Sequence, residues 1–222
     1  MKWVDVLMKL LDLEKGSMDH LLLSTYVEFT RRQSDYASVF IYRDPNDKID
    51  TCCFVHMKPP NNGNPYIQIG LGKTKKHYGE FKCDLPKSLL NSLNLSLKKD
   101  PRDYLFGNKT IEGFRQWCNT SLKRIFNNPD VTVNSLRHAH AEYIDTKAGI
   151  KMGERKREAW KMGHSVMKQL EYNLNLNASK GSDMEKCYRM NPITKQLEGP
   201  LSQAEVARAM KEGQSLFYEK VV

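Results

Sequence analysis

The sequence predicts a mainly α fold with a small antiparallel β-sheet, an α+β chain. Apolar residues recur at helical spacing before residue 30 and again after residue 85. Between these two regions lie short runs rich in β-branched and aromatic residues, separated by turn residues, as is typical of strands. The order is therefore helices, a small sheet, then more helices, and no internal repeat is visible.

Two helices are expected at the N-terminus. The first covers residues 2–13, where apolar side chains recur at helical spacing, and Gly16 ends this run. Ser17 is suited to cap a second helix over residues 18–29, because a serine hydroxyl can accept a hydrogen bond from a free N–H of the first turn.

The sheet is expected from four runs. They are SVFIYRD (38–44), DTCCFVHM (50–57), YIQIGL (66–71) and EFKCDL (80–85). A turn at PND follows the first run, the loop KPPNNGNP separates the second and third, and the basic turn KTKKHYG precedes the fourth.

Further helices are expected after the sheet. They cover residues 86–97, 111–126, 133–145, 157–163 and 165–174. Pro86 suits the start of the first of them, because proline is tolerated where a helix begins. The helix at 111–126 has one apolar stripe, formed by Ile111, Phe114, Cys118, Leu122 and Ile125.

The chain is expected to divide near residue 178. The stretch ASKGSD, residues 178–183, has the composition of a linker. It separates a large domain, residues 1–177, from a small C-terminal module of unknown role, residues 184–222, which is expected to end in the strand SLFYEKVV.

Composition limits the function. The 222 residues carry a net charge of +9, which favours a polyanionic partner, nucleic acid before membrane; a basic protein without such a partner is the alternative. No apolar run approaches the roughly 18 residues of a membrane span. The N-terminal stretch carries Asp5, Asp12 and Glu14 and lacks a signal cleavage site, and the five cysteines form no CxxC pair, so an intracellular protein with reduced thiols is expected.

Several chemistries are disfavoured. His138 and His140 are two residues apart, so on a helix their side chains are separated by about 200° around the axis and cannot coordinate the same metal ion. Neither HExxH, a zinc-type Cys/His cluster nor GxSxG occurs, and GLGKTKKHYG lacks the Walker spacing. We therefore expect no metal and no cofactor.

Cations and a tyrosine recur in four motifs, TRRQSDYASV, IQIGLGKTKKHYG, NSLRHAHAEYI and KMGHSVMKQLEYN. The residues that they supply are Arg32, Lys73, Lys76, Arg137, His164 and Tyr172. Asp35 follows Arg32 by three residues, so its carboxylate is expected to orient that guanidinium. Taken one at a time, each side chain also has an ordinary structural interpretation, such as a surface arginine, a solvated turn lysine or a core tyrosine.

The order of these motifs resembles the catalytic domain of the tyrosine recombinases, a family that includes the phage-type integrases. The shared pattern is Arg-x-x-Asp, a hairpin lysine, Leu-Arg-His, Gly-His-Ser and a following tyrosine. It spans roughly residues 19–176, most of the chain. TRRQSDYA and KTKKHYG are similar to the branch found in large DNA viruses and their satellite elements, which would place the protein in cytoplasm, nucleus or viral factory.

The resemblance implies metal-independent DNA cleavage and rejoining through a 3′-phosphotyrosine. It makes Tyr172 the nucleophile, with Arg32 and Arg137 forked onto the non-bridging oxygens and His164 donating a further hydrogen bond. Each such preorganised donor lowers the barrier by roughly 3 kcal/mol. Tyr143, on the preceding helix, is expected to belong to the core.

Two positions stay open within the resemblance. Lys73 matches the general acid that protonates the leaving 5′-oxygen, with Lys76 as the alternative because the hairpin alignment can slip. The family usually has histidine where this chain has Asn134, and an amide can hydrogen-bond but cannot act as a base. The site is then slower, or His138 or His140 takes part, although His138 occupies a slot that is usually structural.

The implied partner is double-stranded DNA, with self-association into a tetrameric synapse on it and no membrane. Residues 1–17 are too few for the N-terminal clamp domain of such enzymes, so either a longer protein or backbone contacts by the basic patches KTKKHYGEFK, KKDPR and GERKREAWK are expected. Three alternative functions remain. The protein is a type IB topoisomerase-like enzyme, a catalytically weak DNA-binding relic of a recombinase, or a helical interaction module that resembles the recombinases by chance.

Overall fold

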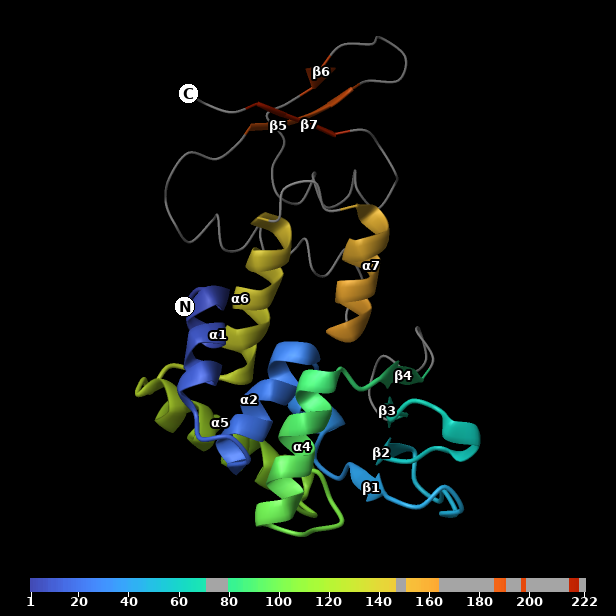
Figure 1. Ribbon diagram of the computed structural model, residues 1–222. Coiled ribbons are helices and arrows are strands. Elements are labelled where there is room, and N and C mark those ends of the chain that lie inside the picture. Colours follow the sequence, from blue (N-terminus) through green and yellow to red (C-terminus); the bar gives the residue numbers. More distant parts are fainter. Residues whose placement is uncertain (71–79, 147–150, 164–185, 191–196, 199–215, 220–222) are drawn as a thin grey trace. The chain divides into compact units, whose positions relative to one another are not determined.

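The structure, a computed structural model, has an α+β fold (Figure 1). It describes residues 1–70, 80–146, 151–163, 186–190, 197–198 and 216–219. The chain forms two compact units, Met1–Gln169 and Leu170–Val222. In the described part, the first unit contains six α-helices and a four-stranded sheet, and the second contains three short strands. The expected linker at 178–183 lies outside the described residues.

The two N-terminal helices form as expected. They are α1 (Trp3–Asp12) and α2 (Met18–Glu28). The Ser17 hydroxyl accepts the His20 N–H at 3.1 Å, which confirms the predicted cap. Gly16 between the helices has φ +80°, a left-handed conformation that suits glycine. Trp3 and Val6 are buried, and α1 lies beside α6 (Figure 1).

The sheet contains all four expected strands but is not purely antiparallel. Its order is β1 (Phe40–Tyr42), β2 (Cys53–His56), β3 (Tyr66–Ile69) and β4 (Phe81–Asp84). The β2–β3 and β3–β4 pairs are antiparallel, as expected, whereas β1 and β2 are parallel. The prediction of an antiparallel sheet was therefore wrong for its first pair.

The reason is the segment between β1 and β2. The chain turns at residues 44–47, where the Asp47 carboxylate accepts the N–H groups of Arg43 and Asp44. The returning segment forms no ladder with β1. Instead the Tyr42 hydroxyl donates to Asp50 Oδ1 at 2.6 Å. The chain then reverses a second time, so β2 runs in the same direction as β1, and a pattern of strand runs and turns does not reveal this extra reversal.

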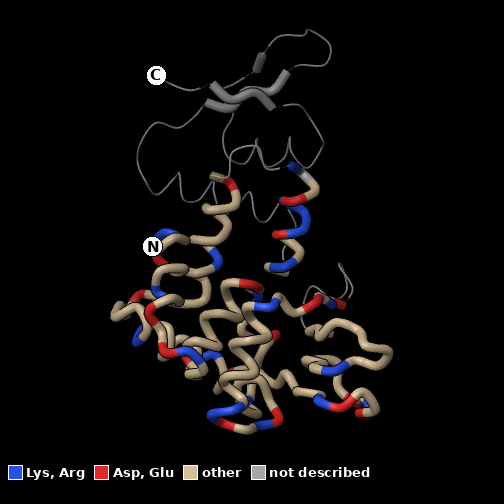
Figure 2. The backbone as a smooth tube through the Cα atoms, viewed as in Figure 1, with Lys and Arg blue, Asp and Glu red and all other residues tan. Residues whose placement is uncertain are grey.

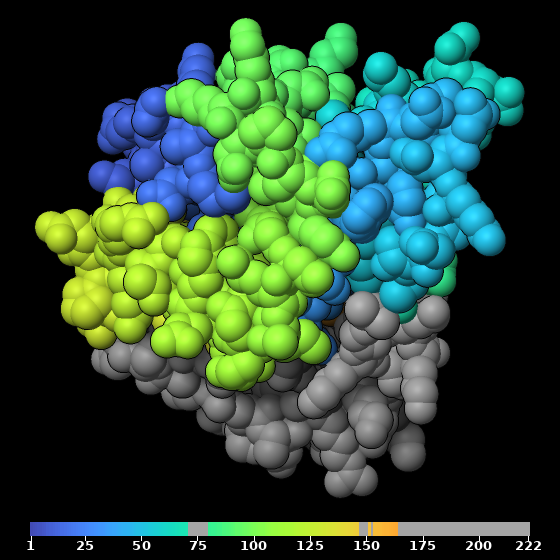
Figure 3. Space-filling model, turned by 90° about the horizontal axis from the view of Figure 1, so that it is seen from below, coloured from blue at the N-terminus to red at the C-terminus, as the bar shows by residue number. Residues whose placement is uncertain are grey.

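The four helices after the sheet are α4 (Lys87–Lys99), α5 (Ile111–Phe126), α6 (Val133–Thr146) and α7 (Met152–Lys161). Helix α5 matches its predicted bounds because Thr110 caps its first turn and Asn127 ends it with φ 48°. The predicted stripe is buried except for Ile111, which is 50% exposed. On the face shown in Figure 3, the green segment that follows β4 lies between the N-terminal helices and the sheet.

Helix α7 begins earlier than predicted, at Met152 rather than at residue 157. In its first two turns three consecutive basic residues lie between Glu154 and Glu158 (Figure 2), so these turns lack the apolar spacing that marks a helix in sequence. The helix expected at 165–174 lies outside the described residues.

In the second unit, β7 (Leu216–Glu219) confirms the predicted last strand. Two further strands, β5 (Lys186–Met190) and β6 (Leu197–Glu198), were not predicted. Strand β5 pairs antiparallel with β6 and with β7.

Candidate active site

A pocket of about 670 Å³ opens between the segment after α2, helix α5 and the start of α6. We name it the arginine pocket. The residues that line it are Arg32, Gln33, Ser34, Arg115, Asn119, Thr132, Val133, Asn134 and Arg137. Three of them, Arg32, Asn134 and Arg137, are residues to which the sequence resemblance gives a catalytic role.

The arginine pocket favours an anion. The described residues contribute three arginines and no acidic side chain to its lining, although Arg115 is paired with Glu112 next to the pocket at 2.8 Å. Thr132, Val133 and Asn134 stand at the beginning of α6, where the first N–H groups lack helical partners and the helix dipole is positive. A phosphate entering the pocket would therefore meet guanidinium groups and a helix N-terminus together, which is a combination suited to phosphate binding.

The Arg32 side chain lines this pocket without a hydrogen bond or ion pair to another residue of the described ranges. It stands just before the short 3-10 turn Gln33–Asp35 and is partly exposed. Such a guanidinium can turn to a ligand without breaking a bond to any residue of the described ranges.

The expected pairing of Asp35 with Arg32 is not the one in the structure. The 3-10 turn directs Asp35 into the protein interior, where its Oδ2 accepts Arg31 Nε at 3.0 Å; both side chains are only 4% exposed. Arg31 points inward and its neighbour Arg32 points to the pocket because successive residues of an extended segment face opposite ways. The carboxylate therefore orients the arginine one position earlier.

Arg137 forms the inner end of the pocket. It is 3% exposed, and its Nη1 donates to the carbonyl oxygens of Thr30 at 2.5 Å and Met162 at 3.0 Å. These bonds tie α6 to the end of α2 and to the last turn of α7. Asn134 lies three residues earlier on the same face of α6 and is exposed. The guanidinium is thus held in one orientation by the fold itself.

Gln33 connects the two walls of the pocket. Its Nε2 donates to Asn119 Oδ1 at 2.8 Å and to the Arg115 carbonyl at 3.5 Å, both on α5. A neighbouring hollow of about 310 Å³ shares Arg115 and Asn119 and extends along α5 to Lys123. Arg115 and Asn119 were not predicted, because in the sequence they are ordinary members of the polar face of an amphipathic helix.

The two histidines of the motif differ in environment. His140 is 6% exposed, bonds Thr30 Oγ1 through Nδ1 at 2.8 Å and lies against the Trp3 ring, with 4.4 Å between centroids. Burial lowers the pKa of His140 to about 4, although Glu158 nearby opposes this. His138 is half-buried, and burial together with the Arg137 charge lowers its pKa. His140 is therefore a neutral packing residue near pH 7.

The remaining predicted site residues, Lys73, Lys76, His164 and Tyr172, lie outside the described residues. The description of the first unit ends at Gly163, directly before His164. Tyr143, expected in the core, is 39% exposed on α6, so that expectation was wrong.

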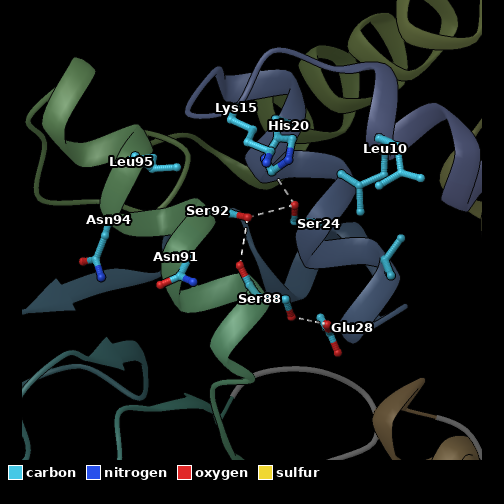
Figure 4. Close-up of a pocket in the computed structure, with 12 residues that line it drawn as sticks. Leu10, Lys15, His20, Ser24, Glu28, Ser88, Asn91, Ser92, Asn94 and Leu95 are labelled. Carbon is cyan, nitrogen blue, oxygen red and sulfur yellow. Dashed lines mark hydrogen bonds between the residues drawn. The ribbon is translucent and has the colours of Figure 1, made fainter.

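A second hollow, of about 550 Å³, lies among α1, α2 and α4 (Figure 4). A row of hydrogen bonds crosses it: Ser24 Oγ donates to Ser92 Oγ at 3.2 Å, and Ser92 Oγ donates to the Ser88 carbonyl at 3.0 Å. The Ser88 hydroxyl in turn donates to Glu28 Oε1 at 2.7 Å. This row joins α2 to α4, and none of the predicted site residues that the structure describes lines the hollow.

No family model matches this chain, and no curated protein matches it. Across the described ranges, no group of three or more His, Cys, Asp or Glu side chains is arranged to hold a metal ion. In the same part of the chain, no helix combines the length and apolarity needed to cross a bilayer.

Proposed function

We propose that the protein cleaves and rejoins DNA strands as a tyrosine recombinase-type enzyme, through a covalent 3′-phosphotyrosine formed by Tyr172. The observation that supports this most strongly is the arginine pocket. Arg32 lies about a hundred residues before Asn134 and Arg137 in the sequence, yet all three line one pocket, to which the described residues contribute no acidic side chain.

In this proposal the scissile phosphate occupies the arginine pocket. Arg32 and Arg137 neutralise the charge that builds on the non-bridging oxygens in the transition state, each lowering the barrier by roughly 3 kcal/mol. Arg137 is already oriented by the Thr30 and Met162 carbonyls, so little reorganisation is needed when the phosphate arrives. The N-terminus of α6 adds a further favourable field.

The covalent step exchanges one ester for another. Tyr172 first releases its phenolic proton to water, its oxygen then bonds to phosphorus, the bond from phosphorus to the 5′-oxygen breaks, and Lys73 or Lys76 protonates that oxygen. The reverse attack by the 5′-hydroxyl restores the phosphodiester, so no energy source is required. His164 follows directly after Gly163, next to the Met162 carbonyl that Arg137 binds, which supports its assignment as a further phosphate donor. Asn134 contributes a hydrogen bond rather than a base.

Duplex DNA is the proposed substrate. The hollow along α5 continues from the arginine pocket and offers Lys123, together with Arg115 in its exposed ion pair with Glu112, to neighbouring phosphates. Together with the net charge of +9, this favours a backbone-dominated, salt-sensitive contact. Assembly of a tetramer on DNA belongs to the same proposal.

A covalent trapping experiment tests the proposal. The protein is incubated with a pool of nicked duplexes of random sequence, in which the fragment released by cleavage diffuses away, and adducts that survive denaturing electrophoresis are sequenced. Wild type and Tyr143→Phe are expected to form an adduct on the 3′ side of the break, whereas Tyr172→Phe forms none. An adduct with Tyr172→Phe, or none with wild type, rejects the proposal.

The exposed amide of Asn134 favours one alternative, a DNA-binding relic of such an enzyme, because this position then supplies no base to the tyrosine. The relic binds duplex DNA but forms no adduct. A type IB topoisomerase-like enzyme forms the adduct too, but it relaxes supercoiled plasmid and exchanges no strands between two duplexes.

A further inference from the structure

Behind the arginine pocket, Arg31 lies inside the protein although it is the direct neighbour of Arg32. Its Nε donates to the buried Asp35, and its Cζ lies 4.3 Å from the centroid of the Phe81 ring. Taking two charges out of water is costly, and an ion pair in this position often stabilises a fold no better than apolar side chains would. The contacts of Arg31 with other parts of the fold therefore need a separate explanation.

Those contacts lead to the last turn of α7. Arg31 Nη1 donates to the Trp160 carbonyl at 3.2 Å, and the same oxygen accepts the Gly163 N–H at 3.0 Å. Gly163 has φ +65°, and a Cβ built on it would lie 3.2 Å from Arg31 Nη2 and 3.4 Å from Cζ. A positive charge is favourable at a helix C-terminus, and glycine is the residue that fits here both by conformation and by space.

A second guanidinium binds the same turn. Arg137 Nη1 donates to the Met162 carbonyl at 3.0 Å, two residues after the Trp160 carbonyl that Arg31 binds. Arg137 lines the arginine pocket, and Arg31 is joined covalently to Arg32, which also lines it. The end of α7 is thus fixed to two of the arginines that line the pocket, directly to Arg137 and, through Arg31, to Arg32.

We propose that Arg31, oriented by Asp35, is a positioning residue that holds Gly163, the residue that precedes His164 in the chain, at the end of α7. The proposal rests on the proposed function, in which His164 donates a hydrogen bond to the scissile phosphate. Arginine is required since its planar fork reaches a carboxylate with Nε and a carbonyl with Nη1 at once, whereas a lysine ammonium is a single point of charge.

Epistasis with His164 tests this role. Single-turnover cleavage and DNA affinity are measured for Arg31→Lys in the wild-type and in the His164→Ala background. We expect Arg31→Lys to slow cleavage roughly 10- to 100-fold with unchanged affinity, since small displacements of a positioned group cost this much. In the His164→Ala background it adds no further loss. The matched control is Arg43→Lys, because Arg43 also forms an ion pair, with Asp103, but an exposed one. This substitution is expected to leave the cleavage rate unchanged in both backgrounds.

A second measurement needs no cleavage. Exchange of the Gly163 amide hydrogen is followed in the DNA-free full chain, where Arg31→Lys and Asp35→Asn are each expected to accelerate it and Arg43→Lys is not. Unchanged exchange in both variants, or a loss of cleavage that is as large in the His164→Ala background, overturns the proposal. If wild type forms no adduct, the proposed function fails, and the exchange result alone decides whether Arg31 fixes the end of α7.

Discussion

Replacing Arg32 by alanine is expected to abolish most of the activity while leaving the fold intact. In the described part of the chain its side chain has no hydrogen bond or ion pair, and it is only partly buried at the rim of the arginine pocket. Substitutions of this kind change the free energy of unfolding by no more than about 0.5 kcal/mol.

The effect on cleavage follows from the role of the guanidinium. Removal of one preorganised donor from a developing anion costs about 3 kcal/mol of transition-state stabilisation, which is a loss in rate of roughly 10² to 10³-fold. Binding also loses one phosphate contact, so the slope of log affinity against log salt becomes shallower by about 0.9.

The assay compares wild type, Arg32→Ala and the control Arg43→Ala, an exposed arginine remote from the pocket lining. Single-turnover adduct formation, urea unfolding and DNA affinity at several salt concentrations are measured for each. A cleavage rate for Arg32→Ala within about threefold of wild type would show that this guanidinium does not hold the phosphate. A stability loss of several kcal/mol would show that the side chain has an internal role instead.

Two further predictions concern stability. Because burial lowers the pKa of His140 to about 4 from an ordinary value of 6.5, the unfolded chain takes up this proton first as the pH falls. The free energy of unfolding is thus expected to decline by up to roughly 3 kcal/mol between pH 6.5 and pH 4 because of His140. His140→Gln should lack this contribution when urea unfolding is measured across the same pH range. Identical pH profiles for wild type and variant would contradict the prediction. On α5, Phe114→Ala should cost about 3–5 kcal/mol and Ile111→Ala less than about 0.5 kcal/mol, since only the first is buried; equal losses in thermal unfolding contradict the observed helix register.

The helices and strands follow from the sequence wherever spacing and local signals agree. Helix α5 has both an apolar period and a cap at Thr110, and its bounds were predicted to the residue. Helix α7 has no apolar period in its first turns, so only its second half was recognised. The parallel pairing of β1 with β2 depends on a second chain reversal that the Tyr42–Asp50 bond stabilises, and such a contact between a strand and a loop has no local sequence pattern.

The candidate site shows a similar division. Arg32, Asn134 and Arg137 were singled out by the order of motifs, and spacing alone would have left them as ordinary polar residues. The partner of Asp35 was assigned by counting three residues, whereas the fold directs the carboxylate to Arg31. Arg115 and Asn119 belong to the pocket only because α5 packs next to Gln33, which is a tertiary contact.

The amide of Gln33 has a consequence for how the site receives its substrate. Because it bonds α5 at two points, the distance between the opposing walls is set before any polyanion arrives. Docking then requires little loss of conformational entropy from the protein, so most of the attraction between the charges remains available as affinity. Loss of the Gln33 amide should leave the arginines in place and yet slow the association of DNA with the pocket and make its binding geometry less uniform.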